Sequence, residues 1–87
     1  MPYTVTIERK AAKFIRDLTD KRLSLRLREA IDALVENPRE TGCVKLQGES
    51  ELYRVRVRDY RIVYRIQDSV LVVLVVQIGH RREIYRQ

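Results

Sequence analysis

Apolar residues in the first half of the chain recur with the spacings of one strand and two helices. Residues 3–7, YTVTI, alternate and contain β-branched side chains, which is typical of a strand. In residues 8–20, the i, i+3, i+4, i+7 spacing of one helical face is filled by Ala11, Phe14, Ile15 and Leu18. A second helical stripe consists of Leu23, Leu27, Ala30, Ile31 and Leu34. We therefore expect two antiparallel amphipathic helices after the first strand.

The limits of the second helix follow from residues with strong backbone preferences. Thr19 or Asp20 ends the first helix and can cap the second, because both side chains accept hydrogen bonds from amides at a helix start. Asn37-Pro38 stops the second helix, since proline cannot continue a helix and disfavours helical geometry in the residue before it. Residues 38–51 are expected to form a loop with a short turn of structure.

The second half of the chain consists of three predicted strands. Residues 53–58 and 60–67 alternate and are separated by almost nothing, which predicts a tight hairpin that turns near Asp59. The unbroken apolar run from Val70 to Val76 is too short to cross a membrane and is typical of a central strand buried on both faces. Gly79 ends this strand.

A two-residue turn in the hairpin fixes which side chains share a face of the sheet. Whether the turn is Arg58-Asp59 or Asp59-Tyr60, one face is apolar and aromatic and the other is cationic. The first face carries Tyr53, Val55, Val57, Tyr60, Ile62, Tyr64 and Ile66. The second face carries Arg54, Arg56, Arg58, Arg61, Val63 and Arg65. Like charges across a sheet are destabilising, so a function must offset this cost.

These elements predict a single α+β domain that covers residues 1–87. Their order is strand, two helices and three strands, followed by a short C-terminal tail. By the layer rule for such domains, the two-helix hairpin packs on one face of a mostly antiparallel four-stranded sheet. The helices cover the tyrosine and isoleucine face, and the arginine face stays open as a concave, positively charged surface.

The charge of the chain indicates the kind of ligand that the open face binds. The net charge is +6, and residues 44–87 contribute +4 of it, with eight of their nine cations being arginine. The planar fork of donors in arginine binds phosphate and stacks on bases. Solubility alone does not explain the preference for arginine, so the sequence predicts a polyanionic partner.

Several other classes of protein do not fit the sequence. No window of about eighteen uncharged apolar residues is available to span a membrane, and the N-terminus lacks the apolar stretch of a secretory signal. The one cysteine, Cys43, cannot form an internal disulfide, so we expect a cytoplasmic protein. With one histidine and no acidic residues at ligand spacing, metal-independent chemistry without a cofactor is expected.

The order of elements and several motifs resemble the RelE/ParE superfamily of toxins, with the RelE branch as the closer match. The motifs are KLQG at residues 45–48, LYRVRVRDYRIVYRI, and the ending VVQIGHRREIYRQ. The resemblance runs from about Thr4 to Arg86 and implies an endoribonuclease that enters the ribosomal A site and cleaves mRNA, inhibiting translation. It also implies a cognate antitoxin that wraps round the toxin, with promoter DNA bound only through the toxin–antitoxin complex.

The resemblance further implies which residues act on RNA. The basic pair on the strand after the KLxG loop falls on Arg54 and Arg56, and the arginine of the next strand falls on Arg61. The arginine after the glycine of the last strand falls on Arg81, and a tyrosine near the C-terminus falls on Tyr85. Arg58 and Arg65 have no counterpart in the family and are expected, from their place on the cationic face, to contact the RNA backbone or antitoxin carboxylates. Lys45 and Arg82 complete the set expected to bind RNA or the ribosome.

The chain departs from the best-known RelE pattern in ways that bear on mechanism. Arginines stand in place of paired lysines, Gln47 replaces a basic loop residue, and Gln87 ends the chain without a further helix. Attack of a ribose 2′-OH on the adjacent phosphate needs a proton acceptor, a proton donor and stabilisation of the charged phosphorane. Arginine, with a pKa above roughly 12, suits only the last role, so Tyr85 and His80 are the candidates for proton transfer.

Two other function classes stay open on the sequence alone. A ParE-like toxin would poison DNA gyrase without cleaving RNA, and the joint presence of Arg61, Arg81 and Tyr85 argues against it. A non-catalytic nucleic-acid-binding relative would need the basic charge but no defined tail.

Overall fold

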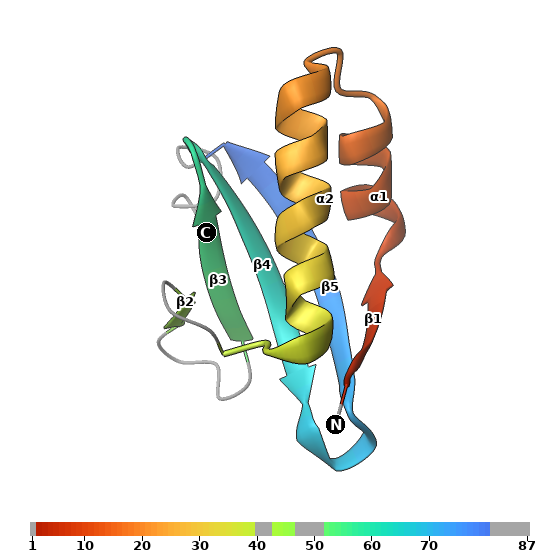
Figure 1. Cartoon of the computed structure of the whole chain (residues 1–87), viewed down its shortest axis with the longest axis vertical. Helices are drawn as coiled ribbons and strands as arrows, with labels where there is room; N and C mark the ends of the chain where they lie inside the picture. Colours follow the sequence, from red (N-terminus) through yellow and green to blue (C-terminus); the bar gives the residue numbers. More distant parts are fainter. Residues whose placement is uncertain (1, 40–42, 47–51, 81–87) are drawn as a thin grey trace.

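The computed structural model describes residues 2–39, 43–46 and 52–80, in which both helices cover one face of a single sheet (Figure 1). The elements are β1 (Thr4–Ile7), α1 (Arg9–Arg16), α2 (Lys21–Glu36), β2 (Cys43–Lys45), β3 (Leu52–Val57), β4 (Tyr60–Gln67), a short 3-10 turn (Asp68–Val70) and β5 (Val72–His80). The strand order is β1-β5-β4-β3-β2, with β1 parallel to β5 and the other neighbours antiparallel. The predicted α+β class and the helix-covered face are confirmed.

The sheet has five strands where four were expected. The additional strand is β2, which lies in the segment expected to be a loop and pairs with β3 at the edge of the sheet. Its three residues are too few to show the alternation that identifies a strand in sequence. Cys43 lies on β2 opposite Val55 and is half-buried.

The second helix has the limits that its capping residues predict. The Asp20 carboxylate accepts a hydrogen bond from the Leu23 amide at 3.1 Å, and the helix ends at Glu36, with Asn37 as its C-cap directly before Pro38. The first helix is shorter than expected and ends at Arg16. Between helices and sheet, the core consists of Ala11, Ile15, Leu23, Leu27, Ile31, Leu34, Ile62, Tyr64, Ile66, Val73, Val75 and Ile78.

The apolar strand β5 is buried on one face only, which corrects the expectation of burial on both. It begins at Val72, whereas Val70 lies in the preceding turn and is 63% exposed. Val73 is fully buried beneath the helices, but Leu74 is half-buried on the other face. The reason is that the described helices cover only one side of the sheet, so the apolar run lacks a second layer.

A polar cluster fastens the end of α2 to the turn between β4 and β5. Two guanidinium nitrogens of Arg39 donate to the two carboxylate oxygens of Asp68 at 3.0 and 2.8 Å, and Arg39 Nε donates to the Tyr53 hydroxyl at 3.2 Å. The Tyr3 hydroxyl also donates to Asp68, at 2.7 Å. The hydrogen bonds from Arg39 and then from Tyr3 lower the pKa of Asp68 to about 2. The cluster therefore joins β3 to the residue that precedes β1, the segment after α2 and the turn between β4 and β5.

This cluster predicts a specific loss of stability in acid. The folded pKa of Asp68 lies below the ordinary value of about 3.9, so its contribution is complete above about pH 4 and is lost as the pH falls through 2. Asp68→Asn should lower the unfolding temperature by a few degrees at neutral pH and should weaken its dependence on pH between 4 and 2. Thermal unfolding followed by circular dichroism measures both effects.

Asp32→Asn is the matched control, because Asp32 is an exposed carboxylate without an ion pair in the part of the chain that the structure describes. If the two asparagine variants lose stability with acid in the same way, the cluster contributes nothing particular to the fold.

Candidate functional site

The hairpin of β3 and β4 places the predicted arginines in a defined register. Its two-residue turn is Arg58-Asp59, and the pairs across the hairpin include Arg54 with Val63 and Arg56 with Arg61. The opposite pairs, such as Tyr53 with Tyr64, point into the helix-covered core. We use "arginine face" for the side of the sheet away from the helices, which carries Arg54, Arg56, Arg61 and Arg65.

Arg61 lies on the central strand β4, near the hairpin turn, and is almost completely buried. Its exposed fraction is 5%, and its guanidinium donates a long hydrogen bond of 3.4 Å to the Tyr60 carbonyl oxygen. Its neighbour on one side is Arg56 and on the other is Gly79, which has no side chain to occupy the space beside it. The expectation of an open, positively charged face is therefore wrong at this position, where the guanidinium is buried.

Arg56 is held above the hairpin turn by the turn itself. Its Nε donates to the Arg58 carbonyl oxygen at 2.8 Å, and its guanidinium lies 3.9 Å from the Asp59 carboxylate. The side chain is still 59% exposed, so it is positioned without being covered. A fixed, accessible guanidinium beside a buried one can clamp a phosphate and stabilise charge that develops on it.

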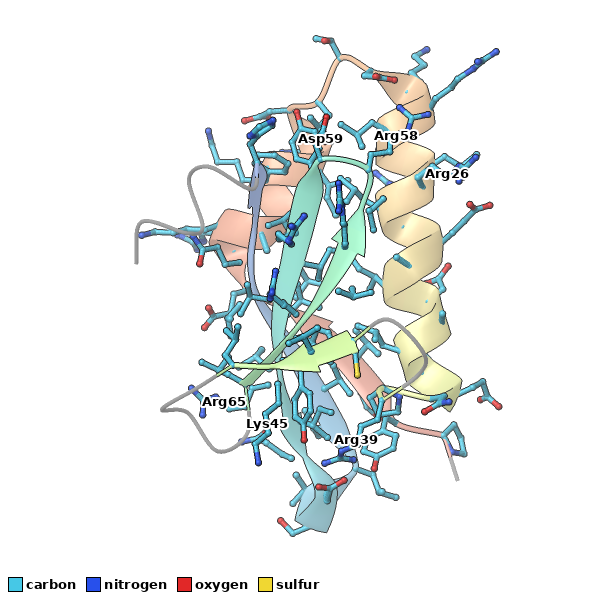
Figure 2. The ribbon with its side chains drawn as sticks, turned by 90° about the vertical axis from the view of Figure 1, so that its left-hand side faces the viewer. Arg26, Arg39, Lys45, Arg58, Asp59 and Arg65 are labelled. Carbon is cyan, nitrogen blue, oxygen red and sulfur yellow. The ribbon has the colours of Figure 1, made fainter. Side chains whose placement is uncertain are left out.

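Arg58 does not lie on the arginine face, which corrects the prediction. Its backbone φ of 55° is in the left-handed region, and this conformation interrupts the alternation of side chains along the strand. Its guanidinium lies 4.0 Å from the Asp20 carboxylate at the start of α2. Figure 2 shows Arg58 turned toward α2, at the same end of the molecule as Asp59.

His80 packs on the helix-covered side of the sheet rather than beside Arg61. It pairs with Tyr60 across β4 and β5, with ring centroids 5.4 Å apart and an edge-to-face orientation. Tyr60 in turn contacts Phe14 of α1, with ring centroids 5.9 Å apart. This candidate for proton transfer therefore lies on the opposite side of the sheet from Arg56 and Arg61.

Two further predicted cations lie toward the other end of the sheet. Arg65 belongs to the arginine face, where it pairs with Leu52 and Leu74, and Lys45 is exposed on the edge strand β2. Figure 2 shows both at the end of the molecule opposite Arg58 and Asp59. They are placed to contact a long ligand that extends from Arg61, but not the same phosphate.

Sequence reasoning missed one polar residue of the arginine face, Gln77. It pairs with Val63, which pairs on its other side with Arg54, so Gln77 and Arg54 lie in the same row of the sheet with Val63 between them. Gln77 is half-buried. The polarity of Gln77 within an otherwise apolar strand could have indicated that it contributes to this face. The predicted residues Arg81, Arg82 and Tyr85 lie outside the described residues.

Neither a metal site nor a membrane span is found in the described part of the chain. No three His, Cys, Asp or Glu side chains gather there as ligands for a metal ion. None of the helices in residues 2–39, 43–46 and 52–80 has the length and apolar character needed to cross a membrane. The arginine face, as described, supplies stabilisation of negative charge but no general base.

Comparison with known proteins agrees with the arrangement of the fold and the motifs. The sequence profile of the ParE toxin family of type II toxin–antitoxin systems matches residues 5–85. The toxin RelG of Mycobacterium tuberculosis is 29% identical over 87 residues, which cover 100% of both chains. The mRNA interferase toxin RelE of Escherichia coli is 30% identical over 91 residues, covering 100% of this chain and 94% of that one.

Solved structures extend this likeness to three dimensions. The RelE–RelB complex from the archaeon Pyrococcus horikoshii contains a chain of the same fold, with a TM-score of 0.79 and 30% sequence identity. The match covers 93% of this chain and 97% of that one. Sequence profile, relatives and fold agree, so the chain belongs to the RelE/ParE superfamily of toxins from type II toxin–antitoxin systems, on its RelE side.

Proposed function

We propose that this toxin is a ribosome-dependent, metal-independent endoribonuclease that cleaves mRNA in the A site and thereby inhibits translation. The observation that carries the proposal is the pairing of exposed, fixed Arg56 with buried Arg61 on the helix-free face of the sheet. An mRNA interferase among the relatives, the RelE toxin of Escherichia coli, supports the same activity. Two adjacent guanidinium groups suit a phosphate that gains charge during the reaction.

The proposed reaction forms one bond to phosphorus and breaks another. The ribose 2′-oxygen attacks the adjacent phosphate and gives up its proton to an acceptor, and the bond from phosphorus to the 5′-oxygen breaks as that oxygen takes up a proton. The products are a 2′,3′-cyclic phosphate and a 5′-hydroxyl. Arg54, Arg56, Arg61 and Arg81 stabilise the charged phosphorane, and Tyr85 transfers a proton. Lys45, Arg58, Arg65 and Arg82 hold RNA or the ribosome.

We also propose a cognate antitoxin that silences the protein in the cytoplasm. The archaeal relative was solved as a complex of RelE with RelB, and the arginine face here offers a cationic surface for an acidic segment. Such a segment would combine carboxylates with apolar residues in a helix. Promoter DNA would be bound through the antitoxin part of the complex only.

Induction of the toxin alone should stop protein synthesis before DNA replication, because the message is the proposed substrate. Mapping of mRNA 5′ ends after induction should show new ends whose positions follow the reading frame.

The second candidate is a gyrase inhibitor, which the match to the ParE family profile favours. Arrest of replication while translation continues, with no new 5′ ends, would replace the nuclease proposal by that one.

A further inference from the structure

The first half of α2 carries charges opposite to those that the helix dipole favours. Residues 21–28 contain only basic charges, and residues 29–36 contain only acidic ones. The basic residues are Lys21, Arg22, Arg26 and Arg28, and the acidic ones are Glu29, Asp32 and Glu36. Cations near a helix N-terminus are unfavourable because the backbone amides already give that end a partial positive charge. The order of charges therefore costs stability, which indicates a role in binding.

Two of these cations lie together on one flank of the helix. Arg22 and Arg26 are one helical turn apart and exposed, so their like charges repel each other. In the part of the chain that the structure describes, neither side chain forms an ion pair. Arg58 reaches this end of α2 from the hairpin turn, with its guanidinium 4.0 Å from Asp20 (Figure 2).

We propose that Arg22, Arg26 and Arg58 form a second phosphate-binding surface, the α2 flank, which contacts the backbone of ribosomal RNA. The inference rests on the proposed ribosomal function, because it supplies the RNA that the flank would meet. Exposed guanidinium groups suit phosphate oxygens, and in the described residues Arg22 and Arg26 have no carboxylate partner, whereas Arg58 has a long ion pair with Asp20 that a phosphate could replace. The hairpin turn accepts a hydrogen bond from Arg56 of the arginine face and directs Arg58 toward α2, so the two surfaces meet at one end of the molecule.

The α2 flank would orient the toxin on the ribosome through residues that take no part in catalysis. Contacts to phosphate fix the position and orientation of a protein on a nucleic acid but carry no sequence information. In this arrangement the arginine face holds the message, and the α2 flank holds the structured RNA around it. Leu25, which directly precedes Arg26 in the chain and is 57% exposed, would instead suit an apolar contact with a protein, so antitoxin binding must be measured in parallel.

The test compares two double variants that remove the same charge from different helices. Arg22→Gln/Arg26→Gln alters the flank, and Arg9→Gln/Lys10→Gln alters two exposed cations at the start of α1. Dissociation constants are measured against 70S ribosomes without message, against a short RNA duplex and against the antitoxin, each over a range of salt concentrations. The flank variant should bind ribosomes roughly tenfold or more weakly, with a salt slope reduced by about 2, while the control changes less than about threefold.

Each outcome decides the inference. Equal losses in the two double variants would overturn it, because only net charge would then matter. A loss of antitoxin affinity without a loss of RNA affinity would also overturn it and assign the flank to a protein partner. If the wild-type toxin binds the duplex through the flank but has no affinity for ribosomes, the flank is retained and the ribosomal function fails. The flank variant should have an unfolding temperature at least as high as that of the wild type. The reason is that the substitutions remove two cations from the positively polarised N-terminal half of α2.

Discussion

Arg61→Ala should lower the single-turnover rate of cleavage on ribosome-bound message by about 10²- to 10³-fold. This is the loss expected when a pre-positioned donor to developing negative charge is removed. Arg61 is suited to that role because the fold holds its guanidinium at 5% exposure, beside the exposed Arg56, so little reorganisation is needed when the phosphate gains charge. Induction of the variant in cells should be tolerated.

Because Arg61 is buried, alanine at this position leaves a cavity and could lower the stability of the fold as well as the activity. A second variant is therefore needed to separate the two effects. Arg61→Met keeps most of the length of the side chain and removes the charge, so it should lose the same activity while its unfolding temperature stays within a few degrees of the wild type. Removal of the cation also ends the repulsion with Arg56 directly across the hairpin, which favours stability.

Arg65→Ala is the matched comparison on the same strand and face. It should weaken binding of the toxin to the ribosome but leave the rate on bound message within a few-fold, because Arg65 lies four residues from Arg61, toward the other end of the sheet. A fully active Arg61→Met, or an equal loss of the chemical step in Arg65→Ala, would show that Arg61 has no particular catalytic role.

The hairpin was predictable from sequence because its register depends on local features only. Side chains of a strand alternate with a period of two, and a two-residue turn then fixes which positions face each other. This was sufficient to place Arg54, Arg56 and Arg61 on one face. The side of the sheet on which Arg58 lies was not predictable in this way. Arg58 adopts a left-handed backbone, and the turn contains no glycine or asparagine that would indicate this conformation.

The last strand could not be predicted in the same way because its pairing contains a bulge. Tyr64 pairs with Val75 and Val63 with Gln77, so Val76 is an extra residue relative to β4. One extra residue reverses the faces of all positions that follow it. Without the bulge, alternation from Val73 would place His80 on the arginine face; with it, His80 lies on the side of Tyr60.

Because the bulge turns His80 away from the arginine face, Tyr85 remains as the candidate for proton transfer. The second large effect that we expect is therefore in Tyr85→Phe. The substitution keeps an aromatic ring that can stack on a base and removes only the hydroxyl, so the chemical step should slow by about 10²-fold or more while binding changes little. His80→Gln should stay within tenfold of the wild-type rate, because the His80 ring packs against Tyr60 at 5.4 Å, on the helix-covered side. Single-turnover cleavage of ribosome-bound message gives both rates.

The pH dependence of the wild-type rate separates the same alternatives without a mutation. An acid–base histidine would bend the profile between about pH 5 and 7, whereas a tyrosine, with an ordinary pKa of about 10, would leave that range without a bend. A slow His80→Gln variant together with such a bend would assign proton transfer to His80 and require the end of β5 to rearrange on the ribosome. If neither variant loses as much as tenfold, both assignments are wrong, and catalysis rests on the electrostatics of the arginine face and on ribosomal groups that position the message.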